Sequence, residues 1–337
     1  MNTLNVALIG AGRMARTHAN VLGHVGYVSI QTVCDAAAEN AAALAEFFGA
    51  HATTSLDEVL HDDGITAVII TTPTATHADL ISKVAHSGKH IFVEKPVAHT
   101  LEAADHAVQA VEAAGVQCQV GFQRRYDPSY LEAKRKIERG ELGTLEGFRG
   151  LSRDAFLPPV EFLKTSGGLM VDMGIHDLDS ARYFVGEVEE VYCIGAVHAE
   201  PELRDYGLFD SAVATLRFAN GALGTIESGL RTAYGYEVRA EILGDGGRLH
   251  LERDSRYHLR QYGKVGGFYE RPADFEAYFH EAYAAEIRTF ANNVHQGKPV
   301  TPNAADARES LRLALATQHS LETGTIVKVS TFGEVHP

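Results

Sequence analysis

The chain has 337 residues, 45% of them hydrophobic, and a formal net charge of −14. This length suits two domains better than one, and the acidic balance argues against general nucleic-acid binding. No apolar run approaches the roughly 20 residues of a membrane-spanning helix, and the N-terminus lacks the basic flank and long apolar stretch of a signal peptide. The three cysteines are far apart, with no CxxC pair or Cys/His cluster, so we predict no disulfide framework and no metal site. We therefore expect a soluble cytoplasmic protein with no membrane partner.

Strand and helix patterns alternate through the first 120 residues. Short apolar runs predict strands at 4–9, 28–34, 65–72, 90–93 and 116–120. Helices are predicted at 36–48, which Gly49 stops, and from Thr100 to Gly115. Such alternation with short connections is typical of a parallel, doubly wound sheet, the Rossmann arrangement.

The pattern changes after Gly121, where most strand candidates follow one another directly. They lie at 188–198, 211–218, 222–228, 237–243 and 248–252. Asn220-Gly221 and Asp245-Gly246-Gly247 predict hairpin turns between them. Helices are expected at 128–139, 168–184, 275–295 and 304–323. We thus predict an α/β protein with an N-terminal domain over 1–121 and a second α/β domain over 122–337, whose large open sheet is mostly antiparallel. The helix at 304–323 is a candidate to pack back on the first domain.

A glycine-rich loop follows the first strand and opens a helix. Gly10 allows a tight turn, Gly12 lets a pyrophosphate approach the helix N-terminus, and Ala15 lets the helix pack closely on the sheet. This is a GxGxxA motif in the strand–turn–helix context that a dinucleotide site needs. The alternative is a tight turn that binds no ligand.

Asp35 ends the second strand about twenty residues after the loop. A carboxylate there can accept hydrogen bonds from ribose hydroxyls and would repel a 2′-phosphate. The next three residues are alanines, so no adjacent Arg can hold that phosphate. The cofactor predicted is NAD rather than NADP, unless Asp35 is an ordinary residue of a strand-end turn.

Glu94-Lys95-Pro96 lies at the C-terminal end of the fourth predicted strand, the edge where open α/β sheets bind ligands. A Lys at this edge can favour alkoxide character as a hydroxyl loses its proton. From the tripeptide alone, a solvated strand-end Lys is the better interpretation.

Asp172 and His176 are four residues apart on the helix predicted after Gly167-Gly168. Side chains at that spacing share one helix face. A carboxylate and an imidazole together can bind a polyol, and the imidazole can accept a proton near neutral pH. The alternative is a common surface ion pair. A metal site needs more ligands than this pair supplies.

Together, GAGRMA, EKP and GG-x3-D-x3-H-D resemble the glucose–fructose oxidoreductase/inositol dehydrogenase (Gfo/Idh/MocA) family over essentially the whole chain. The resemblance implies an NAD(P)-binding Rossmann domain, a substrate-binding and oligomerisation domain, and often a homotetramer. It also places Lys95, Asp172 and His176 at the reacting carbon, as catalytic residues.

Three further segments resemble the inositol 2-dehydrogenase branch. Residues 121–127 are similar to its GFMRRYD, with Gln123 in place of Met, and residues 234–237 are similar to its YGYD, with Glu237 in place of Asp. Residues 282–286 are similar to its AYDVE. The resemblance makes Arg124, Tyr236 and Tyr283 candidate substrate-binding residues, while a surface Arg and half-buried core tyrosines are the alternatives.

We therefore expect an NAD-dependent dehydrogenase that oxidises a secondary hydroxyl of a cyclic polyol or sugar, such as an inositol. The predicted cofactor contacts are Gly10, Gly12, Arg13, Met14, Asp35, Thr72, Pro73, Glu94 and Lys95. The acid/base is His176 or Lys95. Two rival hypotheses are an NAD-dependent glycosidase of the same fold and a non-enzymatic redox sensor, which would need no proton acceptor.

Overall fold

The computed structural model describes residues 3–23, 25–253, 255, 259, 261–264 and 266–334. The chain forms two compact units. The first unit comprises the chain up to Gln123 together with Glu281–Glu309, and the second comprises Arg124–His280 together with the segment from Ser310 onward. The first unit therefore includes a segment far from residues 1–121 in the sequence.

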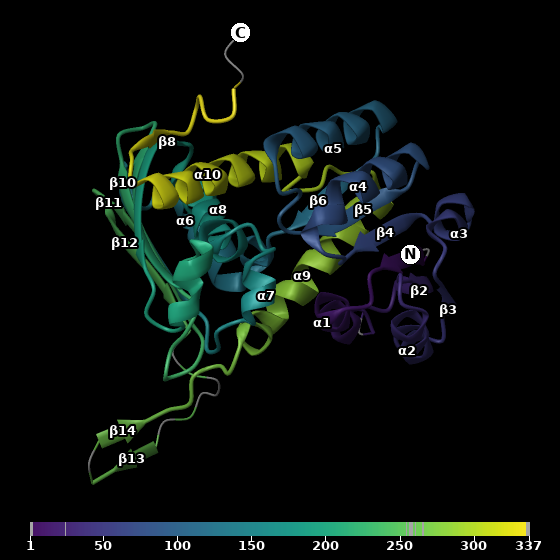
Figure 1. Cartoon of the computed structure of the whole chain (residues 1–337), viewed down its shortest axis with the longest axis horizontal. Coiled ribbons are helices and arrows are strands. Elements are labelled where there is room, and N and C mark those ends of the chain that lie inside the picture. The colour runs from purple at the N-terminus through teal and green to yellow at the C-terminus, as the bar shows by residue number, and fades with distance from the viewer. Residues whose placement is uncertain are drawn as a thin grey trace. The chain divides into compact units, whose positions relative to one another are not determined.

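A six-stranded parallel sheet forms the centre of the first unit (Figure 1). Its order is β3-β2-β1-β4-β5-β6, with every neighbouring pair parallel. The strands are β1 (Leu4–Ile9), β2 (Val28–Cys34), β3 (His51–Thr53), β4 (Ala67–Ile70), β5 (His90–Glu94) and β6 (Cys118–Gly121). This order reverses between β1 and β4, which confirms the predicted doubly wound sheet.

Helices connect these strands, and one further helix comes from much later in the chain. The helices are α1 (Arg13–Leu22), α2 (Ala38–Phe48), α3 (Leu56–His61), α4 (His77–His86) and α5 (Leu101–Ala114), followed far along the chain by α9 (Phe275–Gln296). Ile287 and Phe290 of α9 join the buried core that contains Leu8 and Phe92. Ala15 of α1 is fully buried in the same core, as the predicted close packing of that helix requires.

A seven-stranded sheet forms the second unit, in the order β12-β11-β7-β10-β9-β8-β15. Its strands are β7 (Leu145–Arg153), β8 (Val188–Ala196), β9 (Ser211–Phe218), β10 (Leu223–Gly229), β11 (Glu237–Gly244), β12 (Gly247–Glu252) and β15 (Val327–Lys328). All neighbouring pairs are antiparallel except β7 and β10, which run parallel. The predicted turns at Asn220-Gly221 and Asp245-Gly246-Gly247 join β9 to β10 and β11 to β12, and both hairpins are confirmed.

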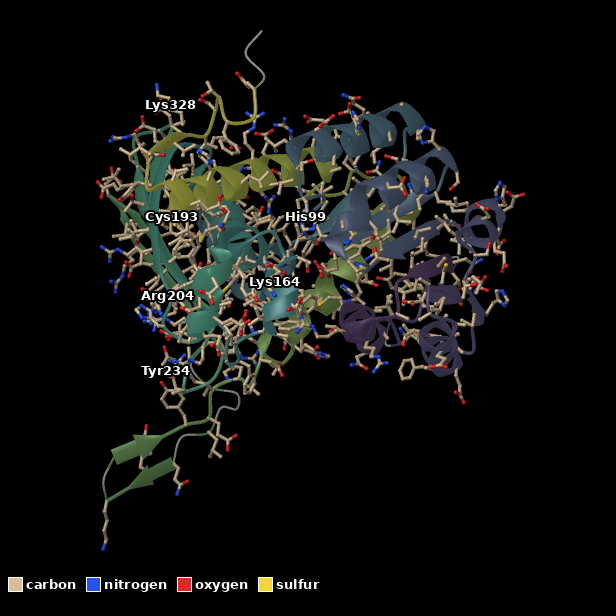
Figure 2. All side chains as sticks on the ribbon, viewed as in Figure 1. His99, Lys164, Cys193, Arg204, Tyr234 and Lys328 are labelled. Carbon is tan, nitrogen blue, oxygen red and sulfur yellow. The ribbon has the colours of Figure 1, made fainter. Side chains whose placement is uncertain are left out.

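The helices of the second unit are α6 (Pro128–Glu138), the short α7 (Val160–Leu163), α8 (Ile175–Val185) and most of α10 (Ala304–Thr323). They cover one face of the sheet. Phe184 of α8 packs near Phe148 of β7, and the backbone N–H of Cys193, labelled on β8 in Figure 2, donates to Ser320 Oγ of α10 at 2.9 Å. A separate hairpin of β13 (Gln261–Gly263) and β14 (Gly266–Phe268) extends from this unit.

The helix predicted over 168–184 does not form as one α-helix. It opens with a π-helical turn at Met170–Gly174, and α8 follows. The elements β3, α4 and β7 had no individual prediction. Strand β3 is only three residues long, and β7 includes two glycines, so neither carries a strong hydrophobic pattern.

In the described part of the chain, no helix has both the length and the apolar character to cross a membrane.

Candidate active site

The glycine-rich loop links β1 to α1 and leaves open space at the helix N-terminus. Gly10 has a φ of +93°, and a Cβ there would lie 2.9 Å from the backbone of Thr71, so only glycine fits this position. A Cβ at Gly12, the N-cap of α1, would meet no heavy atom within 4 Å. The first N–H groups of α1, at Arg13 and Met14, follow at this open end. A helix N-terminus with such space suits a phosphate group.

Asp35 ties the second strand to the same loop. Its Oδ2 accepts the N–H of Ala11 at 2.7 Å, and its Oδ1 accepts the N–H of Ala37 at 2.8 Å. The carboxylate is only half-buried, and each oxygen keeps a further lone pair for a ribose hydroxyl. The loop and Asp35 together therefore fit the diphosphate and ribose of a dinucleotide.

His77, at the start of α4, joins the loop after β4 to the loop after β5. Its Nε2 lies 2.9 Å from the carbonyl oxygen of Thr72, and its Nδ1 lies 2.8 Å from the carbonyl oxygen of Pro96. The side chain is 1% exposed, and burial lowers the pKa of the imidazole, against the opposing effect of the two carbonyl groups. His77 thus holds the Thr72-Pro73 loop beside the Lys95-Pro96 loop. The sequence gives no signal for this beyond a His at a helix start.

Lys95 directly follows β5 and is half-buried. Its backbone N–H donates to Oε2 of Glu94 at 3.3 Å, and the Lys95–Pro96 peptide bond is cis. The other oxygen of Glu94 lies 2.6 Å from Nε2 of His18. The Lys therefore sits on a backbone segment held by a buried side chain, at the carboxyl edge of the parallel sheet.

Asp172 and His176 lie on the π turn and the first turn of α8 in the second unit, and both are half-buried. Gly167 and Gly168 precede them with φ of +88° and +99°, in the region that favours glycine. Next to Gly168, the amide oxygen of Gln318 accepts the N–H of Met170 at 3.1 Å. The paired glycines thus make the chain reversal that starts the helix. π turns within helices are frequent at functional sites.

Asp172 also lines a small cavity in the second unit. The rest of its lining is largely apolar, with Leu169, Met173, Phe209 and Leu230.

Arg124, a predicted substrate-binding residue, is 2% exposed and lies behind the same helix. Its Nη1 donates to Asp177 Oδ1 at 2.7 Å and its Nη2 to Ser152 Oγ at 2.8 Å. Burial opposes the charge of the guanidinium, but the Asp177 carboxylate more than offsets this and raises the pKa of Arg124. Arg125 makes an equivalent buried pair with Asp179, at 2.6 Å.

The two tyrosines of the prediction lie in different units. Tyr236 is 6% exposed and packs edge-on against Tyr278 in the second unit, where burial raises the pKa of its phenol. Tyr283, on α9, is 4% exposed and packs edge-on against His18 in the first unit. Both rings are therefore part of packed interiors.

Each unit gathers its own share of the predicted site residues. The first unit places its candidates at the carboxyl edge of the sheet, in the loops after β1, β2, β4 and β5, at the end of β5 and in the first turn of α1. They are Gly10, Gly12, Arg13, Met14, Asp35, Thr72, Pro73, Glu94 and Lys95. The second unit contains Asp172 and His176 on one helical segment.

Known proteins match the chain over nearly its full length. Residues 4–122 match an oxidoreductase family model with an NAD-binding Rossmann fold, and residues 130–250 match the GFO/IDH/MocA C-terminal domain. The scyllo-inositol 2-dehydrogenase (NAD(+)) of Bacillus subtilis is 38% identical, over 96% of this chain and 95% of that protein. The myo-inositol 2-dehydrogenase of Thermotoga maritima is 33% identical, over 97% and 98%.

Solved structures show the same fold. The scyllo-inositol dehydrogenase of Lactobacillus casei, crystallised with NAD(H) and scyllo-inositol, superposes with a TM-score of 0.92 at 28% identity. The match covers 98% of this chain and 100% of that chain.

Proposed function

The chain belongs to the GFO/IDH/MocA family of oxidoreductases, and on that basis we propose that it is an NAD-dependent dehydrogenase that oxidises a secondary hydroxyl of an inositol. The observation that carries this proposal is the glycine loop with Asp35 on one unit and the Asp172/His176 segment on the other. The relatives named above act on scyllo- or myo-inositol, and these two isomers are the first substrates to test.

Bound NAD supplies the hydride acceptor, and the side chains of this protein handle the proton and the charge. His176 takes the proton of the substrate hydroxyl as the ring carbon loses its hydride. Asp172 accepts a hydrogen bond from a neighbouring hydroxyl and so orients the ring. Lys95 stabilises the oxyanion character that develops on the reacting oxygen. The products are a keto-inositol, NADH and one proton.

We assign Arg124 a positioning role instead of direct substrate contact. Asp177 follows His176 in the sequence, and the buried ion pair with Arg124 holds that residue to Ser152 of β7. The Arg124–Asp177 ion pair therefore stabilises the helical segment that carries His176. Tyr236 and Tyr283 stay candidates at lower rank, since both rings are packed inside their units.

The outer face of the seven-stranded sheet supports a homo-oligomer, and we propose the tetramer common in the family. Four of its exposed side chains are apolar, on β8, β9 and β10: Tyr192, Ile194, Val213 and Leu223. Ile194 and Val213 lie opposite one another in the β8–β9 pair. An exposed apolar patch of this kind is usually an interface.

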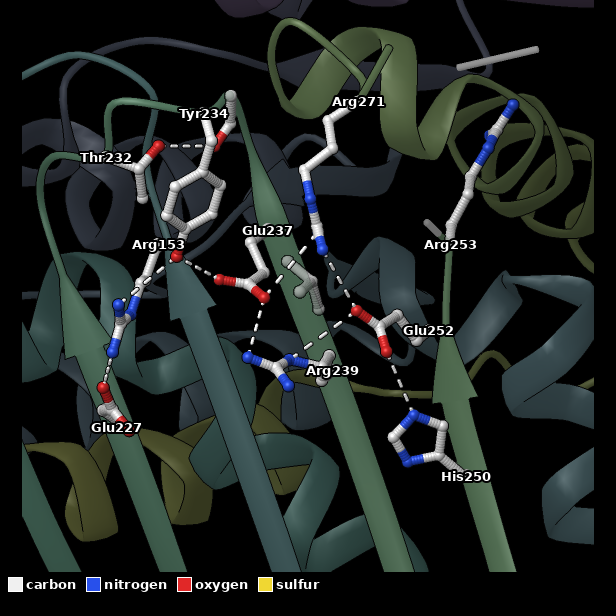
Figure 3. Close-up of polar contacts among 12 residues, drawn as sticks. Arg153, Glu227, Thr232, Tyr234, Glu237, Arg239, His250, Glu252, Arg253 and Arg271 are labelled. Carbon is white, nitrogen blue, oxygen red and sulfur yellow. Dashed lines mark hydrogen bonds and ion pairs between the residues drawn. The ribbon is translucent and has the colours of Figure 1, made fainter. Parts of the chain in front are cut away.

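A polar network continues this face toward β11 and β12 (Figure 3). Glu237 is 3% exposed and takes contacts from Tyr234, Arg239 and Arg271. Charges that are paired within one chain can be covered by a second copy at lower desolvation cost than unpaired charges.

The buried free thiols of Cys34, Cys118 and Cys193 suit a reducing compartment, and we place the enzyme in the cytoplasm.

The deciding experiment assays the purified protein with NAD and a panel of inositols, aldoses and glycosides, following NADH by absorbance and the sugars by product analysis. The proposal expects NADH to accumulate in proportion to the inositol consumed. Turnover of a glycoside without net NADH would favour the glycosidase instead. NAD binding with no turnover of any polyol would favour the redox sensor.

A further inference from the structure

Three titratable side chains meet in the interior of the first unit, directly behind the Lys95 segment. They are His18 of α1, Glu94 of β5 and Glu286 of α9. Each is at most 6% exposed, and their donor and acceptor atoms all lie within 4.8 Å of one another. We call them the buried triad. Nothing in the proposed chemistry uses His18 or Glu286.

The two carboxyl groups of the triad have unequal surroundings. One oxygen of Glu94 lies 2.6 Å from Nε2 of His18, and the other accepts the N–H of Lys95 at 3.3 Å. Glu286 is 0% exposed, and neither of its carboxyl oxygens has a hydrogen-bond partner. Two ionised carboxylates at this separation, away from water, repel strongly. The carboxyl group of Glu286, which has no donor, is therefore the one that burial drives to keep its proton.

The neighbours of Glu286 supply no compensating positive charge. Among the described residues, the titratable groups grouped with it are Glu94 from β5 and His18 from α1. From β6, the neutral Gln119 donates to the carbonyl oxygen of Glu286 and not to its carboxyl group. Burial, and then the charge of Glu94, raise the pKa of Glu286 well above its ordinary value.

A metal ion fits this geometry poorly. Two ligands about 2.1 Å from a tetrahedral zinc ion lie roughly 3.4 Å apart. The 2.6 Å contact between His18 and Glu94 is instead the length of a short hydrogen bond.

We propose that Glu286 is a protonated, neutral acid at neutral pH and acts as a positioning residue. By keeping its proton, Glu286 places no second charge against the carboxyl group of Glu94, which keeps its contacts with His18 and the backbone of Lys95. Glu94 in turn fixes the backbone at Lys95. The inference rests on the proposed function only for the catalytic role of Lys95. The protonation state of Glu286 depends on its buried surroundings in the folded protein and not on the reaction.

The first test is infrared difference spectroscopy of the full-length protein without cofactor or substrate. Wild type should show the carbonyl stretching band of a buried protonated carboxylic acid at neutral pH, and E286Q should lack it. The matched control is Glu281→Gln, which removes an exposed acid of the same helix and should keep the band. A wild-type spectrum without the band, or a band that persists in E286Q, overturns the proposal.

The second test follows the free energy of unfolding with pH. The folded pKa of Glu286 is raised, so the folded state binds its proton more tightly than the unfolded chain. This stabilisation is complete below the unfolded pKa, about 4.3, and is lost as pH rises toward the folded pKa. The Gln side chain of E286Q does not titrate. The free energy of unfolding of E286Q, relative to that of wild type, should therefore increase as pH rises from the unfolded to the folded pKa of Glu286. A difference that is constant with pH contradicts the inference.

The third test separates positioning from simple packing. E286Q mimics the neutral acid and should restore most of the kcat that Glu286→Leu loses, while KM for the polyol changes little in either. Misplacement of Lys95 should cost on the order of a hundredfold in kcat for Glu286→Leu. Equal kcat values for wild type and Glu286→Leu overturn the positioning role. A stoichiometric metal that disappears in E286Q identifies a metal site and overturns the proposal as a whole. If the proposed function fails, the spectrum and the unfolding curves still report on the triad.

Discussion

The Nη1 of Arg124 lies 2.7 Å from Oδ1 of Asp177, and Asp177 is the residue after His176. Both side chains of this pair are nearly inaccessible to water. Breaking a buried pair leaves an uncompensated charge, so Arg124→Ala should lower the free energy of unfolding by roughly 3–5 kcal/mol. It should also reduce kcat through the displaced helix. Urea unfolding and steady-state kinetics measure the two effects.

The exposed pair of Lys83 and Asp79 on α4 gives a matched control for that measurement. Lys83→Ala should stay within about 1 kcal/mol of wild type. If Arg124→Ala keeps wild-type stability and raises only KM for the polyol, Arg124 binds the substrate directly.

Wild type should prefer NAD over NADP, because Asp35 stands where a 2′-phosphate would lie. Asp35→Ser should shift the ratio of kcat/KM toward NADP by roughly tenfold or more, equivalent to about 1.4 kcal/mol. The control is Glu39→Gln, an exposed acid at the start of α2, which should leave the ratio unchanged. A wild-type kcat/KM for NADP equal to that for NAD would contradict this prediction.

Lys95→Ala should damage turnover far more than NAD binding. Removal of a charge that stabilises an oxyanion typically costs on the order of a hundredfold in kcat. Stopped-flow or equilibrium fluorescence titration with NAD should give a Kd close to wild type, whereas steady-state kcat falls. A near-normal kcat would remove Lys95 from the catalytic residues.

His176→Ala should slow oxidation by roughly 10²–10⁴-fold, the usual range for a positioned general base. In wild type the rate should fall on the acid side, because a protonated imidazole cannot accept the hydroxyl proton. The variant should lose that acid limb and keep its NAD affinity, and Asp172→Asn should also be slow. His61→Ala, an exposed His on α3, serves as the control. If the acid limb and most of the rate survive in His176→Ala, Lys95 becomes the leading candidate for the base.

The apolar patch on the outer sheet face should be an interface. Ile194→Glu places a charge on it and should convert the homo-oligomer to smaller species with little loss of secondary structure. Light scattering at micromolar concentration measures the mass. Leu259 is a comparably exposed apolar residue off the patch, and Leu259→Glu should leave the oligomer intact. A wild-type monomer would refute the prediction outright.

The sequence predicts the elements whose patterns are local. The runs at Leu4–Ile9 and Val28–Cys34 form strands over the predicted bounds. Leu4–Ile9 is mostly apolar, as is typical of a buried parallel strand. The GxGxxA loop and the Asn220-Gly221 turn are equally readable, because glycine is required there by conformation.

The parts that sequence analysis missed depend on contacts between distant segments. Glu286 stands in an amphipathic helix, where an acid is normally on the solvated face. Only the return of α9 to the first sheet buries it beside Glu94. The double contact of His77 likewise exists only once β4 and β5 lie side by side.

The division of α9 between the units has a consequence for synthesis on the ribosome. The hydrophobic core of the first unit includes Ile287, Phe290 and Val294, which are made only after the whole Arg124–His280 segment has been translated. At typical rates of about 5–20 residues per second, this delay is roughly ten to thirty seconds. During that time the nascent nucleotide-binding unit exposes the apolar surface that α9 later covers. We therefore expect the core of the first unit to be completed only late in synthesis, almost together with the second unit.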